Sequence, residues 1–159
     1  MRRPDAPLVL VVDDDELVRD LLVTRLELAG YRALAVRDGV DAVSEVFSRT
    51  ISAMILDVSM PRLDGFGVLR AIAAANRKPP PTMVLTARHA SADVGAALSL
   101  GAKDFMAKPF DDQLFLKRVA RLLRQAPAPG AASARVGPDL VPRSSPAEAQ
   151  ADLDNALLL

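Results

Sequence analysis

Short apolar runs alternate with longer stretches of helical periodicity along residues 8–124. The runs are bounded by polar, Gly or Pro residues, which is typical of buried strands in a parallel sheet. The predicted strands are residues 8–12, 31–36, 53–56, 83–85 and 105–107. After each strand, apolar residues recur at spacings of three and four, which predicts a helix. Five strand–helix units in succession predict an α/β fold, with helices on both faces of a parallel sheet.

The five predicted helices are each marked by apolar positions that share one face. These positions are Leu17, Leu21 and Leu28; Ala42 and Val46 with Val43 and Phe47; Phe66, Leu69 and Ile72; Val94, Ala97 and Leu98; and Phe115, Val119 and Leu122. Residues that favour helix ends support these helices. The expected caps and stops are Asp15, Ser91 and Asp111 or Asp112 at the starts, and Gly30, Gly101 and the prolines 79–81 at the ends.

Composition changes near Gln125. Residues 126–159 contain five of the twelve prolines and nine alanines, so this segment can bury little apolar surface. We therefore expect one domain over residues 1–125 and a flexible Ala/Pro-rich tail over 126–159. A short C-terminal helix carrying Leu153, Leu157 and Leu158 is possible in the tail, as a docking peptide, although an isolated helix of this length is marginal in water.

Composition also excludes several classes of function. The chain has no Cys and one His, which rules out thiolate catalysis, disulfides and Cys- or multi-His-ligated metal sites. Its 20 basic and 20 acidic residues give a formal net charge of zero, which removes the usual electrostatic attraction to nucleic acid or anionic membrane. The apolar run at 8–12 is too short for a signal peptide or membrane span. We expect a soluble, cytoplasmic protein with no direct contact to nucleic acid or membrane.

Polar residues follow four of the five predicted strands. They are Asp13 and Asp14, Asp57, Thr86 and Lys108, and the carboxyl ends of parallel strands meet at one edge of a sheet. Carboxylates gathered there repel one another and favour a hard cation such as Mg²⁺. A lysine and a hydroxyl are suitable donors to a tetrahedral oxyanion, and an aspartate among them is a plausible nucleophile toward phosphorus. Each residue alone also fits an ordinary solvated turn or strand end, so the prediction depends on their joint placement.

Four segments carry a resemblance to a known family. VVDDDE (11–16), ILDVSMPRLDGFGVLR (55–70), VLTAR (84–88) and GAKDFMAKPFD (101–111) resemble the receiver domain of bacterial two-component response regulators. The resemblance spans residues 8–124, with the motifs in the family's order and spacing. It implies a flavodoxin-like, chemotaxis-regulator-like (βα)5 fold with strand order 2-1-3-4-5.

The resemblance implies a role for each strand-end residue. Asp57 matches the aspartate that accepts a phosphoryl group from a phosphohistidine of a sensor histidine kinase or histidine phosphotransfer protein. Asp14 matches a direct Mg²⁺ ligand, and Asp13 matches the carboxylate that holds the metal through water or orients its partners. Ser59 matches the position whose backbone carbonyl binds the metal. Lys108 matches the lysine that pairs with the phosphoryl oxygens.

Further positions match the family's switch and tuning residues. Thr86 matches the hydroxyl that moves toward the phosphoryl group, and Phe105 matches an aromatic rotamer switch. Ser59 and Arg88 match positions that tune the lifetime of the aspartyl phosphate. Pro109 is expected to follow a cis peptide bond.

Phosphorylation is expected to change the surface formed by residues 88–100 with the fifth strand and fifth helix. That surface would bind a downstream protein or a second copy of the chain. The charged residues expected to pair across such a homodimer are Lys103, Asp104, Arg118 and Arg121.

Other classes of protein also fit part of this pattern. A haloacid-dehalogenase-type hydrolase also phosphorylates an aspartate, but it needs a second Asp two residues on, where this chain has Ser59. We therefore expect no enzyme acting on a separate substrate, only a phosphoacceptor that catalyses its own phosphorylation and dephosphorylation. Residues 126–159 are too short and too poor in basic residues for a DNA-binding domain. The chain is thus expected to be a single-domain response regulator, a fragment of a larger DNA-binding or enzymatic regulator, or a tail-driven adaptor.

Overall fold

The computed structural model describes residues 3–87 and 91–126. Five strands and five helices alternate along this part of the chain, as predicted. The strands are β1 (Leu8–Val12), β2 (Arg32–Val36), β3 (Ala53–Asp57), β4 (Thr82–Thr86) and β5 (Asp104–Ala107). The helices are α1 (Glu16–Leu28), α2 (Gly39–Ser48), α3 (Gly65–Ala74), α4 (Ser91–Ser99) and α5 (Asp112–Leu123). Asp57 and Thr86, expected just after their strands, are the last residues of β3 and β4.

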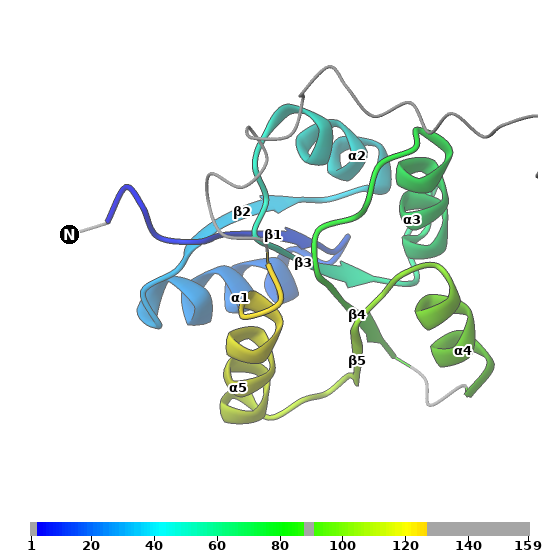
Figure 1. Cartoon of the computed structure of the whole chain (residues 1–159). Helices are drawn as coiled ribbons and strands as arrows, with labels where there is room; N and C mark the ends of the chain where they lie inside the picture. The colour runs from blue at the N-terminus through cyan, green and yellow to red at the C-terminus, as the bar shows by residue number, and fades with distance from the viewer. Residues whose placement is uncertain (1–2, 88–90, 127–159) are drawn as a thin grey trace, which may run out of the picture. The chain divides into compact units, whose positions relative to one another are not determined.

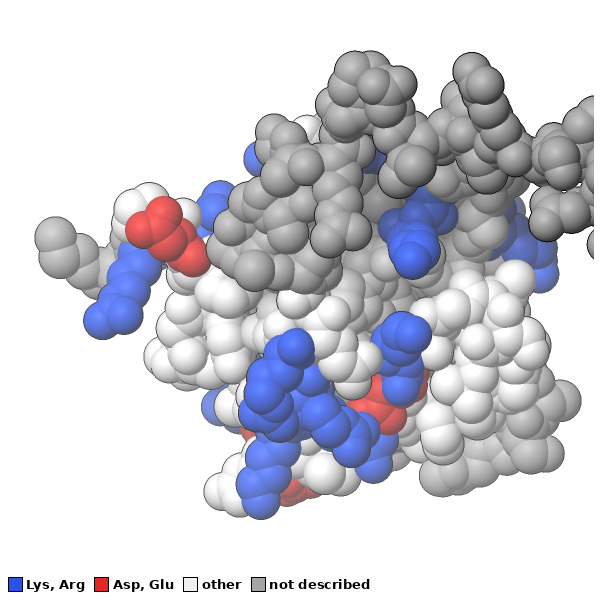
Figure 2. All heavy atoms as spheres, in the orientation of Figure 1, with Lys and Arg blue, Asp and Glu red and all other residues white. Residues whose placement is uncertain are grey.

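The strands form one parallel sheet in the order β2-β1-β3-β4-β5. This confirms the flavodoxin-like order expected from the resemblance. Helices α1 and α5 lie on one face of the sheet, and α2, α3 and α4 lie on the other (Figure 1). In the same view, basic side chains gather beside α5 and over the connection between α3 and β4 (Figure 2).

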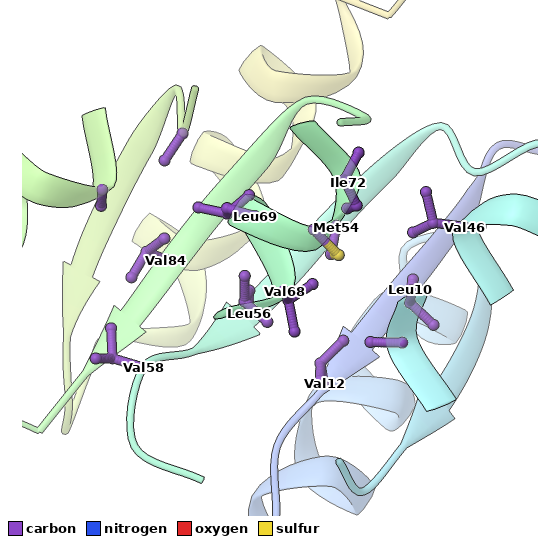
Figure 3. Close-up of a cluster of buried hydrophobic side chains, with 13 residues drawn as sticks. Leu10, Val12, Val46, Met54, Leu56, Val58, Val68, Leu69, Ile72 and Val84 are labelled. Carbon is purple, nitrogen blue, oxygen red and sulfur yellow. The ribbon is translucent and has the colours of Figure 1, made fainter. Parts of the chain in front are cut away.

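Alternating side chains of the central strands fill two separate cores, one on each face of the sheet. Leu10 and Val12 of β1, with Met54 and Leu56 of β3, pack toward the face covered by α2 and α3 (Figure 3). Val9 and Val11 of β1, and Ile55 of β3, pack toward α1 and α5. Strands buried on both faces read as continuous apolar runs, which is why the sequence marked them so clearly.

The predicted inner face of the first helix is wrong. Leu17 and Leu28 are 81% and 76% exposed, and Leu21 is 43% exposed. Leu22 and Leu26 are fully buried against the sheet instead. Both sets of leucines have helical spacing, so the sequence pattern alone did not distinguish them.

The predicted inner faces of the other helices agree better with the structure. Ala42 and Val46 of α2 are buried, as are Phe115, Val119 and Leu122 of α5. Leu98 of α4, however, is 51% exposed, and Phe47 of α2 is 38% exposed. Leu98 thus lies away from the core that its spacing predicted, and Phe47 lies beside the buried positions of α2.

Most of the predicted helix ends are confirmed. The Asp15 carboxylate accepts hydrogen bonds from the N–H groups of Leu17 and Val18, and Asp111 rather than Asp112 caps α5. Gly30, one residue beyond the C-cap of α1, has a φ of +91°, a backbone conformation that glycine adopts without steric cost. Ser91, expected at the start of the fourth helix, is the first residue of α4.

Some predicted features lie outside the described residues. Arg88 falls in the gap between residues 87 and 91, and the tail from residue 127 onward, with its possible C-terminal helix, is not described. The division into a domain over 1–125 and a flexible tail stays a prediction. In the portions that the structure describes, every helix falls short of the length and apolar character that a bilayer crossing requires.

Candidate functional site: an acidic cup at the carboxyl edge of the sheet

Two buried aspartates lie side by side where β1 and β3 end. These strands are neighbours in parallel register, with Val12 opposite Leu56, so the residues that follow, Asp13 and Asp57, reach the same edge of the sheet. Asp13 is fully buried and Asp57 is 4% exposed. The Asp13 carboxylate accepts a hydrogen bond from the N–H of Asp15 (2.9 Å), which anchors it at the start of α1.

Asp14 completes a cluster of three carboxylates. One carboxylate oxygen from each of Asp13, Asp14 and Asp57 lies within 4.8 Å of the other two. Asp14 is exposed, whereas the other two are buried. The cluster therefore opens to solvent on the Asp14 side, where a phosphoryl group could enter.

Lys108 supplies the positive charge of the site. Its Nζ lies 2.6 Å from Asp13 Oδ2 and 3.6 Å from Asp57 Oδ1. The backbone N–H of Lys108 donates to the carbonyl oxygen of Thr86 (2.7 Å), which holds the residue beside the end of β4. The Lys108–Pro109 peptide bond is cis, as expected.

Burial and charge change the proton affinities of this group. Burial, followed by repulsion from Asp13, raises the pKa of Asp57 from 3.8 to about 6, against the opposing attraction of Lys108. For Lys108, burial acts to lower the pKa, but its hydrogen bond to Asp13 and its charge interactions with Asp57 and Asp13 outweigh burial and raise the pKa. Lys108 therefore keeps its positive charge, whereas burial and repulsion destabilise the charged form of Asp57.

The donor set fits a magnesium ion. Closely spaced carboxylate oxygens suit a hard divalent cation, and such an ion keeps some positions for water and phosphate oxygens. The exposed side of the cluster, at Asp14, leaves room for those ligands. Residues that could hold the ion are Asp13, Asp14 and Asp57, with the backbone carbonyl of Ser59.

The loop after β3 is packed tightly against Asp57. The backbone N–H of Ser59 donates to Asp57 Oδ1 (3.3 Å), and the N–H of Gly65 donates to the carbonyl of Val58 (3.0 Å). A Cβ atom at Gly65 would lie only 2.4 Å from the backbone oxygen of Asp57. Glycine is therefore required here because α3 begins in direct contact with the end of β3.

The two expected switch residues lie on neighbouring strands. Thr86 ends β4 and is 5% exposed, and it pairs in register with Ala107 of β5. Phe105 lies two residues before Ala107 and is 37% exposed, so its ring is partly in solvent. The structure thus brings Asp13, Asp14, Asp57, Thr86 and Lys108 to one edge of the sheet, where they form the acidic cup. Phe105 lies on the adjoining surface.

Three of the four charged residues expected to pair across a homodimer, Asp104, Arg118 and Arg121, pair with one another within the chain. Arg118 and Arg121 of α5 contact the carboxylate of Asp104 at 3.1 and 2.8 Å. These contacts tie α5 to the start of β5. Any pairing of the same arginines with a second copy would have to compete with them.

One buried carboxylate near the site was not predicted from the sequence. Asp38, two residues after β2, caps α2 and forms an ion pair with Arg62 in the loop that follows β3. The hydrogen bond from the Asp41 N–H, together with the charge of Arg62, lowers the pKa of Asp38 against the opposing effect of burial. Arg62 has a φ of +67°, unusual for a residue with a side chain. An Asp-Gly pair after a strand signals a helix cap, but nothing local in the sequence indicates the partner.

Comparison with known proteins decides the family. The sequence profile of the response regulator receiver domain matches residues 9–120. This chain belongs to that family. The receiver domain accounts for every strand of the sheet and for all residues of the acidic cup.

Curated relatives cover the receiver domain and extend beyond it. The chain is 41% identical over 117 residues to the response regulator MprA of Mycobacterium avium strain 104, covering 74% of this chain and 51% of that protein. It has the same identity to MprA of Mycobacterium tuberculosis strain H37Rv, covering 50% of that protein. The chain thus spans about half the length of the curated relatives it matches.

Solved structures share the fold of this receiver domain. The Francisella response regulator 1452 receiver domain is 28% identical, with a TM-score of 0.70 over 74% of this chain and 97% of that one. The Vibrio cholerae chemotaxis protein CheY4 is also 28% identical, with a TM-score of 0.69 over 74% and 98%. A putative response regulator from Chloroflexus aurantiacus is 31% identical, with a TM-score of 0.70 over 76% and 100%.

Proposed function

We propose that Asp57 is the phosphoacceptor of a two-component phosphorelay and takes its phosphoryl group from a phosphohistidine. The donor would be a sensor histidine kinase or a histidine phosphotransfer protein. The observation that carries this proposal is the convergence of three carboxylates and Lys108 within one cup. The site contains the nucleophile, the cation ligands and the oxyanion partner that phosphoryl transfer needs, and no separate general base is required.

The transfer exchanges one bond for another at phosphorus. An Asp57 carboxylate oxygen attacks, the P–N bond of the phosphohistidine breaks, and the leaving imidazole takes up a proton. Lys108, 3.6 Å from Asp57 Oδ1, is close enough to pair with a phosphoryl oxygen added there. A magnesium ion held by Asp13, Asp14, Asp57 and the Ser59 carbonyl would neutralise negative charge on the phosphoryl oxygens.

The phosphorylated state would be read at the surface of α4, β5 and α5. Thr86 lies at the end of β4 beside the cup, so its hydroxyl can turn toward a phosphoryl group on the neighbouring strand β3. The partly exposed ring of Phe105 would then move inward to fill the vacated space. A downstream protein or a second copy of the chain would bind the altered surface, through a shift in the populations of the two states.

We further propose that the chain acts on its own Asp57 and not on a separate substrate. Val58 and Ser59 follow Asp57, so the second aspartate that a phosphatase of the dehalogenase type uses as acid and base is missing. Incubation with a small phosphoester tests this point. Sustained turnover would contradict the proposal, and its absence together with self-phosphorylation would support it.

Phosphorylation with a small-molecule donor tests the site assignment. Intact-mass spectrometry after incubation with acetyl phosphate and Mg²⁺ should show one added phosphoryl group. Asp57→Ala should lose the addition, and Asp20→Ala, which changes an exposed aspartate on α1, should keep it. Full phosphorylation of the Asp57→Ala protein would overturn the assignment.

A second candidate is that this receiver works within a larger regulator that carries an output domain. The observation in its favour is that the chain spans about half the length of its curated relatives. An antibody against the receiver, applied to the native organism's extract, distinguishes the two. A band near 16.9 kDa supports a single-domain regulator or adaptor, and a band at about 24 kDa or above, the mass of a chain as long as the curated relatives, supports the larger protein.

A further inference from the structure

A basic groove lies at the edge of the sheet opposite the acidic cup. It is formed by the segments that precede β3, β4 and β5, whereas the cup is formed by residues at the ends of these strands. The groove has a volume of about 440 Å³. Strands of five residues separate the two edges by roughly 15 Å, so the groove has no part in phosphoryl transfer.

Every charged residue among the described lining of the groove is basic. These residues are Arg49, Arg77, Lys78 and Lys103. Within residues 3–87 and 91–126, the structure gives the ammonium groups of Lys78 and Lys103 no hydrogen-bond or ion-pair partner. In the view of Figure 2, basic side chains gather over the connection between α3 and β4, next to the groove. The groove therefore presents unpaired positive charge in a protein whose formal net charge is zero.

The two arginines are held in place by neighbouring groups. The Arg77 guanidinium stacks over the ring of Phe47, 4.9 Å from its centroid, and donates to the Phe47 carbonyl (3.5 Å). Arg49 pairs with Glu45 one helical turn earlier (2.5 Å). Such an exposed pair is weak and exchanges readily with another carboxylate. Among the residues that the structure describes, Arg77 is thus held in place, Arg49 has an exchangeable partner, and the ammonium groups of Lys78 and Lys103 have none.

One wall of the groove is apolar and rigid. Pro79, Pro80 and Pro81 line it in succession, and proline fixes the backbone φ. The Thr82 hydroxyl donates to the Pro80 carbonyl (2.7 Å), and the Met54 N–H donates to the Pro81 carbonyl (2.9 Å). Ile51, half-buried, also lines the groove. This wall suits an aliphatic side chain. Because it is already rigid, binding there would require little further ordering of the protein.

We propose that this groove binds an acidic peptide segment of a partner protein. Carboxylates of the peptide would pair with the two lysines and Arg77, and an aliphatic side chain of the peptide would pack against the proline wall. All four basic residues are exposed, so the groove is too open to enclose a small anion, which pockets usually bury almost completely. A nucleic acid would need a wider basic field than four residues on a chain of zero net charge. An extended peptide matches both the charge and the apolar wall.

Fluorescence anisotropy with the full chain tests the proposal. The probe is a short labelled peptide of glutamates around two leucines, titrated without phosphodonor or Mg²⁺, so the result does not depend on Asp57. Combined Lys78→Glu and Lys103→Glu substitutions should weaken binding about tenfold or more. Lys117→Glu, an exposed lysine on α5 outside the groove, should leave the affinity unchanged. A matched peptide with glutamine in place of glutamate should bind more weakly to the unmodified chain.

Several results would overturn the assignment. Equal affinity in the Lys78/Lys103 variant and the Lys117 variant would exclude the groove, as would NMR shifts that avoid the amides of Ile51, Lys78 and Lys103. Equal binding of the glutamine peptide would exclude recognition of charge. Tighter binding of a short duplex DNA, with the same dependence on the two lysines, would assign the groove to nucleic acid instead.

Discussion

Replacing Asp57 with asparagine should stabilise the metal-free protein. Asp57 is almost fully buried, and its pKa is raised to about 6 by burial and by repulsion from Asp13. The charged form of Asp57 therefore opposes folding at neutral pH. Asparagine has nearly the same shape, its Oδ1 can still accept the hydrogen bond from the Ser59 N–H, and Lys108 keeps its 2.6 Å contact with Asp13.

The size of the effect follows from the proton affinity of Asp57. A tenfold change in proton affinity is worth about 1.4 kcal/mol, so a pKa raised from 3.8 to about 6 corresponds to at most about 3 kcal/mol. Because the folded state holds the proton more tightly than the unfolded state, the free energy of unfolding of the original chain should fall as the pH rises from about 4 to about 6. Above that range, the contribution of the proton is lost.

Urea denaturation followed by circular dichroism, in EDTA, measures this effect. At about pH 7.5, Asp57→Asn should raise the free energy of unfolding by about 2–3 kcal/mol. The two unfolding curves should converge toward pH 4. Asp20→Asn, an exposed control on α1, should follow the original chain throughout. If Asp57→Asn were no more stable than the original chain at pH 7.5, the electrostatic account of the cup would be wrong.

Three further predictions concern Lys108, Arg62 and Arg88. Lys108→Ala leaves the buried Asp13 carboxylate without its 2.6 Å partner, so Mg²⁺ should raise the melting temperature of this variant more than that of the original chain; an equal rise would contradict the pairing. Arg62→Ala removes the ion pair to the buried Asp38 and should lower the midpoint of urea unfolding. Arg70→Ala, whose 3.9 Å contact is to an exposed carboxylate, should have no measurable effect, and equal losses in the two would refute this distinction. Arg88→Ala should change the lifetime of the aspartyl phosphate, measured by phosphate release; an unchanged lifetime would remove Arg88 from the tuning residues.

The order of elements and the residues of the cup were predictable because both depend on local pattern. Strands buried on both faces appear as short apolar runs, and parallel strands bring their carboxyl ends to one edge. Asp13, Asp14, Asp57, Thr86 and Lys108 could therefore be placed together without coordinates. The caps at Asp15 and Asp111 are also local, since each carboxylate bonds to N–H groups a few residues along the chain.

Other features of the protein depend on which surfaces meet in three dimensions. The first helix has two leucine stripes with helical spacing, and only packing against the sheet shows that Leu22 and Leu26 face inward. Asp38 and Arg62 are 24 residues apart, and no local pattern links them. Asp13 and Lys108, 95 residues apart, were expected at the same edge of the sheet, but only the structure shows their 2.6 Å contact. The periodicity of each element and the chemistry at its end are local properties that can be read along the chain. Which face of a helix is buried, which charges meet and how strongly Asp57 holds its proton depend on the folded arrangement, because burial and ion pairing arise from distances between residues that are far apart along the chain.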